Sequence, residues 1–150
     1  MKSTYKRRSV VQALFALAAM ALAPLQLFAR NAPAFEATAA DKTMQALFGD
    51  KTVTQSDKVM LKVPDIAENG AVVPVTVKTK ITGVKRISLI VVDNPNPLSA
   101  SFKLMPGAEA DISTRIKMGQ SSDVIAVVET DSGVYTAKKK VKVTIGGCGG

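Results

Sequence analysis

Short apolar runs alternate with turn-forming residues along most of the chain beyond residue 58. Within these runs apolar and polar side chains tend to alternate, which is the period of a half-buried β-strand. We predict seven strands: Val59–Val63, Val72–Thr79, Ile87–Val92, Ala100–Leu104, Asp111–Lys117, Val124–Glu129 and Val134–Ile145. Because Pro, Gly, Asn and Asp cluster between them, the pattern predicts an all-β fold, an immunoglobulin-like antiparallel β-sandwich.

The last predicted strand follows a hairpin signal, Asp131-Ser132-Gly133. Gly133 can take a positive φ at little cost, so the strand is expected to fold back on Val124–Glu129. Its side chains alternate strictly near the end. Val141, Val143 and Ile145 share one face, which we assign to the core, and Lys140, Lys142 and Thr144 share the other.

A short amphipathic helix is predicted before the strands. Thr38 could cap it, and Gly49 is expected to end it just after Phe48. Its apolar residues fall on one helical face: Ala40, Met44, Leu47 and Phe48. The strand Ile87–Val92 is apolar on both faces, so its outer face must be covered. Either this helix or a second protein subunit could cover it.

The first 34 residues have the organisation of an export signal. Basic residues open the chain, an apolar stretch runs from Val10 to about Ala29, and Ala32-Pro33-Ala34 offers small residues to a signal peptidase. The pair Arg7-Arg8 is close to the twin-arginine pattern, although a lysine precedes it. A transmembrane anchor is the alternative, but polar residues interrupt the stretch. We predict cleavage of residues 1–34 and a periplasmic protein without stable membrane association.

The composition leaves the chain few routes to catalysis. There is no histidine, which removes the commonest general base and metal ligand. Cys148 is the only cysteine, so an internal disulfide and the usual zinc-binding spacings are excluded. The formal net charge of +8 falls to 15 basic against 12 acidic residues past Ala34. With this small excess of basic residues and only 5% aromatic residues, we expect no nucleic-acid binding. With no histidine and a single cysteine, we expect no cofactor, no metal and no catalytic residue.

The chain ends Gly146-Gly147-Cys148-Gly149-Gly150. Glycines cannot pack and are costly to order, so we predict a flexible arm at 146–150 beyond a sandwich domain at 35–145. Extended, the arm could carry the Cys148 thiol roughly 10 Å beyond the sheet. A free thiol is only a few per cent thiolate at pH 7, so its activation must come from another protein. We therefore predict that Cys148 holds a sulfur substrate covalently.

The ending Val143–Gly150 resembles that of the SoxY family, the sulfur carriers of the bacterial Sox thiosulfate-oxidising system. The Gly-Gly-Cys-Gly-Gly terminus is the specific part of the resemblance. Further similarity lies in four segments: Val63–Gly70, Val73–Val75, Asp93–Pro97 and Thr114–Met118. The likeness covers essentially the whole chain after the export signal.

The resemblance implies an immunoglobulin-like sandwich that works as a heterodimer with SoxZ and is not itself an enzyme. It implies that the haem enzyme SoxXA couples thiosulfate oxidatively to the cysteine, and that the manganese hydrolase SoxB then releases sulfate. SoxCD, where present, oxidises the remaining persulfide. The attachment site carries over to Cys148 and the arm to Gly146, Gly147, Gly149 and Gly150.

Three other functions compete with this interpretation. Ubiquitin-like sulfur carriers hold sulfur as a thiocarboxylate on a terminal glycine, but they are cytosolic. A thiol redox protein would want a resolving cysteine or a positive environment around the thiol. A structural immunoglobulin-like module could be linked to a partner by a Cys148 disulfide. The sulfur species found on Cys148 or Gly150 would separate these classes.

Overall fold

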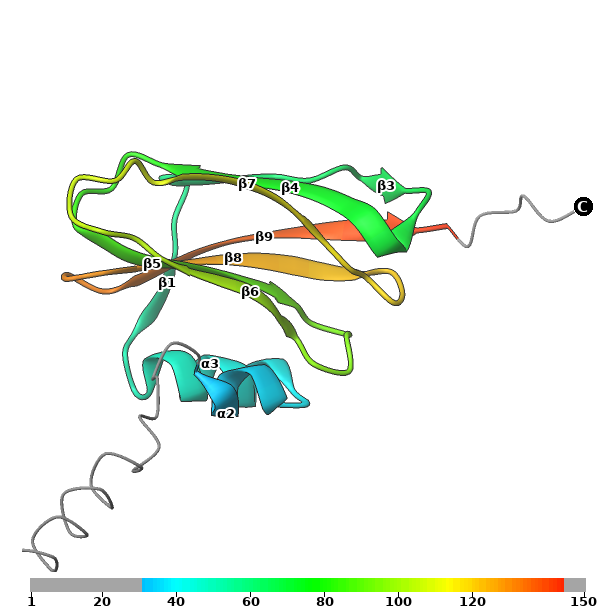
Figure 1. Cartoon of the computed structure of the whole chain (residues 1–150), viewed down its shortest axis with the longest axis horizontal. Helices are drawn as coiled ribbons and strands as arrows, with labels where there is room; N and C mark the ends of the chain where they lie inside the picture. Colours follow the sequence, from blue (N-terminus) through cyan, green and yellow to red (C-terminus); the bar gives the residue numbers. More distant parts are fainter. Residues whose placement is uncertain (1–30, 145–150) are drawn as a thin grey trace, which may run out of the picture. The chain divides into compact units, whose positions relative to one another are not determined.

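The computed structural model describes residues 31–144, which form two β-sheets with two short helices against one of them (Figure 1). The helices are α2 (Ala32–Glu36) and α3 (Ala40–Phe48), and a 3₁₀ turn, η1, spans Gly70–Val72. The strands are β1 (Val53–Gln55), β2 (Val59–Lys62), β3 (Ile66–Ala67), β4 (Val73–Thr79), β5 (Val84–Val91), β6 (Leu98–Lys103), β7 (Asp111–Ile116), β8 (Ser122–Thr130) and β9 (Val134–Val143).

The larger sheet has the strand order β1-β9-β8-β5-β6, and β3 also pairs with β9. The smaller sheet has the order β2-β4-β7. The pairs among β5, β6, β8 and β9 and within the smaller sheet are antiparallel, whereas the two short strands β1 and β3 lie parallel to β9. The predicted all-β sandwich is therefore confirmed. All seven predicted strands are present, and β1 and β3 are additions that the sequence pattern did not predict.

The core lies between the two sheets, where alternate residues of each strand point inward. β4 shows the pattern well, because its inward valines are buried and its outward residues are exposed or half-buried. The central strands supply most of the buried side chains: Val73, Val75, Val77, Ile87, Leu89, Val91, Val124, Ala126, Val128 and Val141. Aliphatic side chains thus build a core that needs no tryptophan.

The two helices lie against the outer face of the larger sheet (Figure 1). A second apolar cluster joins side chains of the helices with side chains of that face. Ile90 on β5 is 0% exposed and packs in this cluster with Phe48 of α3. The helix is therefore what covers the outer face of β5 at Ile90. α3 begins at Ala40, two residues after the predicted cap Thr38, and Gly49 ends it with a φ of 60°. This left-handed φ suits glycine, as predicted.

α2 was not predicted from the sequence. Asn31 caps it, since its side chain accepts a hydrogen bond from the backbone N–H of Ala34, and its amide donates to the carbonyl of Ala46 at 3.0 Å. Ala34 is fully buried in the cluster beneath the helices. The predicted cleavage site therefore falls inside a packed helix. The signal at 1–34 stays a prediction, because residues 1–30 lie outside the part of the chain that the structure describes.

Candidate functional site

The predicted attachment residue Cys148 lies outside the described residues, as do Gly146, Gly147, Gly149 and Gly150. The structure does describe the strand that leads to them. β9 ends at Val143, and Thr144 is the last described residue. We call residues 142–144 the root of the C-terminal segment.

Hydrogen bonds from both sides hold the root. The amides of Lys142 and Thr144 donate to the carbonyls of Asp65 and Ala67, at 2.9 and 3.0 Å. The amide of Val143 points the other way and donates to the Ser121 hydroxyl at 2.9 Å. Since three consecutive amides are bonded, the root is a fixed part of the sheet, and the segment after it starts from a defined position.

A side-chain contact strengthens the attachment of β3 to β9. Lys139 Nζ donates to the carbonyl of Val63 at 2.9 Å and lies 3.0 Å from Asp65 Oδ1. The carboxylate of Asp65 is 85% exposed, so the ion pair itself adds little free energy of folding. The bond to the Val63 carbonyl instead fixes the segment that leads from β2 in the smaller sheet to β3, which pairs with the root.

The segments that carried the resemblance meet at this end of the sandwich. Figure 1 shows β3, from the segment 63–70, beside the end of β9. The loop 93–97 joins the loop after β7, because Asn94 donates to the carbonyl of Lys117 at 2.7 Å and accepts from the amide of Gly119 at 3.0 Å. Ser121, which bonds the root, follows in the same loop. Segments that are far apart in the sequence thus pack together around the root of the C-terminal segment.

Gly70 shows how closely these segments approach. Its carbonyl accepts the amide of Met118 at 2.7 Å. A Cβ on Gly70 would overlap the Met118 carbonyl oxygen and lie 3.0 Å from Val143 Cγ1. The overlap is with backbone, so only glycine fits here without a shift.

We expect Gly70→Ala to destabilise the fold. The new methyl group would push against the Met118 carbonyl and the Val143 side chain, a strain of roughly 1–3 kcal/mol. Thermal unfolding followed by circular dichroism should show a midpoint lower by about 4 °C or more. Gly119→Ala is a matched control, because its Cβ would meet only Asn94 Oδ1 at 3.8 Å. Equal melting temperatures for the two variants would contradict the close approach at Gly70.

The side chains of β9 alternate at the root as predicted. Val141 is 0% exposed and belongs to the core, whereas Lys140 and Lys142 are exposed on the outer face of the larger sheet. Lys138 on the same face lies 3.4 Å from Asp123 of β8. The outer face of β9 is therefore basic along the part that approaches the C-terminal segment.

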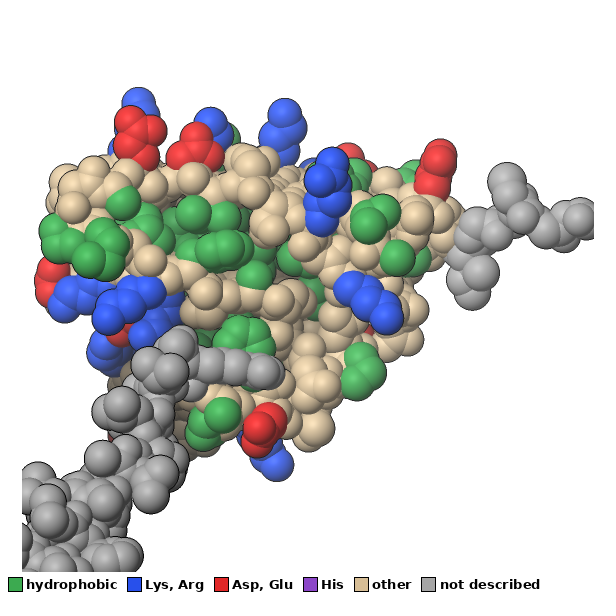
Figure 2. Space-filling view, in the orientation of Figure 1, with side chains coloured by type: hydrophobic (Ala, Val, Ile, Leu, Met, Phe, Trp, Pro, Cys, Tyr) green, Lys and Arg blue, Asp and Glu red, His purple; other side chains and the backbone are tan. Residues whose placement is uncertain are grey.

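The opposite end of the sandwich carries two cavities. An open groove of about 1290 Å³ lies between β2 and the hairpin loops, and it includes the exposed Met60 and Met105. Figure 2 shows hydrophobic side chains gathered at the end away from the end of β9. Lys78 beside this groove is hydrogen-bonded to Asp111, which raises the pKa of that lysine. This groove lies far along β9 from the root.

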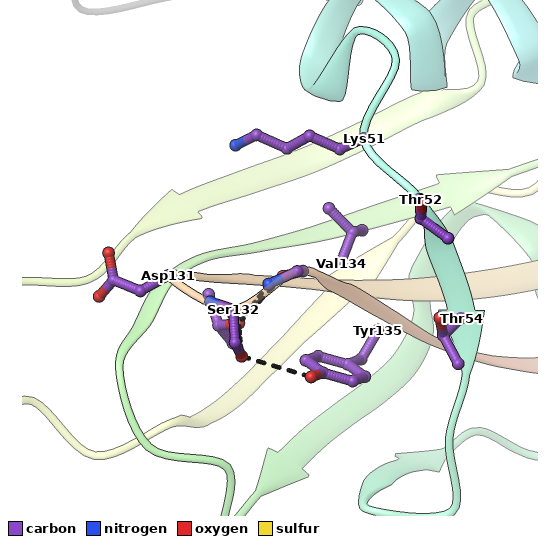
Figure 3. Close-up of a pocket in the computed structure, with 9 residues that line it drawn as sticks. Lys51, Thr52, Thr54, Asp131, Ser132, Val134 and Tyr135 are labelled. Atoms are coloured by element: carbon purple, nitrogen blue, oxygen red, sulfur yellow. Dashed lines mark hydrogen bonds between the residues drawn. The ribbon is translucent and has the colours of Figure 1, made fainter.

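A smaller cavity of about 340 Å³ lies between β1 and the β8–β9 turn (Figure 3). Several of the polar groups that line it are engaged with one another: the Ser132 hydroxyl lies 3.0 Å from Thr130 Oγ1 and 3.3 Å from the Tyr135 hydroxyl. Lys51 at its edge is paired with Glu129 at 2.6 Å. The hydroxyl contacts stabilise the hairpin turn that places β9 beside β8.

Residues 31–144 hold neither a metal-binding cluster nor a membrane-spanning helix. Within this part of the chain no group of three or more His, Cys, Asp or Glu side chains could bind a metal ion. None of its helices is long and apolar enough to cross a bilayer. The expectations of no metal and no cofactor stay predictions.

A protein-family model described as "Sulfur oxidation protein SoxY" matches residues 44–148, well over half of the chain. The chain belongs to the SoxY family. The sulfur carrier protein SoxY from Chlorobium limicola f thiosulfatophilum is similar in structure, with a TM-score of 0.64 and 39% sequence identity. The match covers 70% of this chain and 96% of that one. A comparison with curated protein sequences gave no match.

Two structures of superoxide reductase (neelaredoxin) from Ignicoccus hospitalis share the fold of this SoxY family member, with a TM-score of 0.52 each. Their sequence identities are 20% and 18%. The matches cover 67% and 71% of this chain, and 87% and 93% of theirs. At such identities the likeness concerns the sandwich alone and says nothing of chemistry.

The sequence did not predict which residues hold the root. Asp65 and Ala67 act through backbone carbonyls, which have no signature in side-chain identity. Ser121 stands among ordinary turn residues, and its bond to Val143 joins positions 22 residues apart. The one usable signal was the resemblance of the segments Val63–Gly70 and Thr114–Met118 to the family, since these segments had no other evident role.

Proposed function

We propose that this protein is a periplasmic sulfur carrier that holds thiosulfate-derived intermediates on Cys148. The observation that carries the proposal is the extent of the family match, which runs through the sandwich and ends at Cys148 itself. The related protein from Chlorobium limicola is described as a sulfur carrier. A thiol suits this task because sulfur forms reversible bonds to sulfur.

The fixed root supports a carrier role for the residues beyond it. A carrier must present one atom to several active sites while its folded body stays outside them. The bonds to Asp65, Ala67 and Ser121 hold the chain in place as far as Thr144. Four of the six residues that follow are glycines, at 146, 147, 149 and 150, so they add little width to the segment that carries the thiol.

The carrier is proposed to work as the non-catalytic subunit of a heterodimer with a SoxZ-like protein. SoxXA would load thiosulfate onto Cys148, SoxB would release sulfate, and SoxCD, where present, would oxidise the remaining persulfide. Export by the signal at 1–34 would place the protein with these enzymes in the periplasm. Co-expression with SoxZ and purification through a tag on one chain would test the heterodimer.

Mass spectrometry of protein purified from its source tests the carrier function directly. The expected result is Cys148 carrying sulfane sulfur or a thiosulfonate, with a mass that returns to that of the free thiol on reduction. A thiocarboxylate at Gly150 would instead indicate a ubiquitin-like carrier. A disulfide to a partner protein as the sole modification would indicate a structural or redox module.

Glycine content of the arm gives a separate prediction. We expect Gly147→Val with Gly149→Val to slow loading by SoxXA several-fold, because β-branched side chains stiffen and widen the segment that must enter the active site. The initial rate of Cys148 modification at fixed enzyme concentration measures this. Modification by a small thiol reagent serves as the control and should stay within about two-fold of wild type, since the thiol itself is unchanged. If SoxXA loads the double variant at the wild-type rate, the glycines are not needed to keep the arm narrow and flexible.

A further inference from the structure

The length of the segment beyond the root limits where an enzyme can sit while it acts on Cys148. Cys148 is four residues beyond Thr144. At about 3.5 Å per residue, an extended chain spans at most roughly 14 Å. The amides of residues 142–144 are all bonded, so this reach begins at Thr144 and not farther back in β9. An enzyme with its catalytic atoms below its surface must therefore contact the protein around the root.

An exposed apolar residue and two lysines lie side by side at this place. Ile66 and Lys142 are partners in the parallel pairing of β3 with β9, so their side chains point to the same face. Lys140 stands two residues earlier in β9, on that face too. Ile66 is 57% exposed, and both lysines are exposed. We call Ile66, Lys140 and Lys142 the root face.

No ion pair within the described chain compensates the charge of the root face, although Asp123 of β8 stands opposite Lys140 in the strand pairing. Lys138 uses Asp123 as its partner. Neither Lys140 nor Lys142 forms an ion pair with any carboxylate of residues 31–144. Asp65, next to Ile66, is engaged by Lys139 from the other side of the strand. The root face therefore offers positive charge beside an apolar side chain, next to the point where the chain leaves the sheet.

On the basis of the proposed function, we propose that the root face is a common docking surface for the enzymes that act on Cys148. Each enzyme would present acidic side chains around its active-site opening and an apolar contact to Ile66. A transient enzyme fits better than a permanent subunit, because lysine is depleted in the cores of stable interfaces, whereas exposed charges speed encounter. Since every enzyme must reach the same cysteine within the same short span, their complexes with the carrier exclude one another.

Charge reversal tests this docking surface. Lys140→Glu with Lys142→Glu should lower kcat/KM for the carrier by about ten-fold or more at low ionic strength, with SoxXA and with SoxB alike. The loss should shrink at about 0.5 M salt, where exposed charges are screened. The matched control is Lys58→Glu with Lys80→Glu, which makes the same charge change beside the far groove, at two exposed lysines without an ion pair to residues 31–144. The control should stay within about two-fold of wild type.

Ile66→Ser separates the apolar contact from the charge. It should lower kcat/KM several-fold at low and high salt, because apolar contact is not screened. The modification rate of Cys148 by a small thiol reagent should be the same in all these variants.

Three outcomes would overturn the docking surface. One is a charge-reversal variant that reacts with either enzyme as fast as its matched control. Another is loss of co-purification with SoxZ, which would assign the root face to the partner subunit. The third is an equal loss of kcat/KM at low and high salt. If wild-type Cys148 is never modified by SoxXA, the proposed function itself fails, and that result is independent of the lysines.

Discussion

Cys148→Ser is expected to abolish thiosulfate-dependent sulfate formation in a reconstituted Sox system. A serine hydroxyl can occupy the same space at the tip of the same segment, but oxygen cannot form the reversible bond to sulfur that a thiol forms. Because Cys148 is the only cysteine of the chain, no other residue can take over the attachment. Sulfate release, measured by ion chromatography over many turnovers, should fall to the level seen without the carrier.

The substitution should leave the fold unchanged, so the loss can be assigned to chemistry. Within residues 31–144, strands β2 to β9 and the loops between them supply the cluster that fills the space between the sheets. The unfolding free energy should therefore differ from that of wild type by less than about 0.5 kcal/mol. Sulfate formation above background in the serine variant, with the variant folded and bound to its partner, would rule out Cys148 as the carrier residue.

The sequence predicted the architecture well because burial has a period that can be counted. The alternation in Val72–Thr79 corresponds closely to β4, and Asp131-Ser132-Gly133 forms the predicted turn between β8 and β9. β1 and β3 were missed because three and two residues are too few to show a period. These two strands form because their backbones pair with the edge of β9, and that pairing depends on the tertiary structure.

The candidate site was predictable in its chemistry but not in its surroundings. A lone cysteine among glycines marks Cys148 without any knowledge of the fold. The contacts of Ser121, Gly70 and Lys139 depend on which loops meet at one end of the sandwich, and no local pattern encodes that meeting. The sequence also left open what covers β5, because an apolar outer face looks the same under a helix and under a second subunit.

The covering of β5 leads to the largest expected effect on stability. Ile90→Lys should unfold the isolated chain or bring it close to unfolding. Ile90 is 0% exposed beneath α3, in a cluster with Phe48, Leu98, Val127 and Val134. Replacing it loses about 1.5–3 kcal/mol of apolar burial. A buried ammonium without a partner adds several kcal/mol more, and the sum approaches the roughly 5–15 kcal/mol by which a domain of this size is stable.

Met60→Lys is the matched control, because it introduces the same side chain at an apolar residue that is 61% exposed on β2. Its unfolding free energy should stay within about 0.5 kcal/mol of wild type. Urea unfolding followed by circular dichroism compares the two variants in the absence of any partner. If Ile90→Lys were as stable as Met60→Lys and instead failed to bind SoxZ, the outer face of β5 would belong to a subunit interface. Destabilisation of the isolated chain places Ile90 in the domain's own core, under α3.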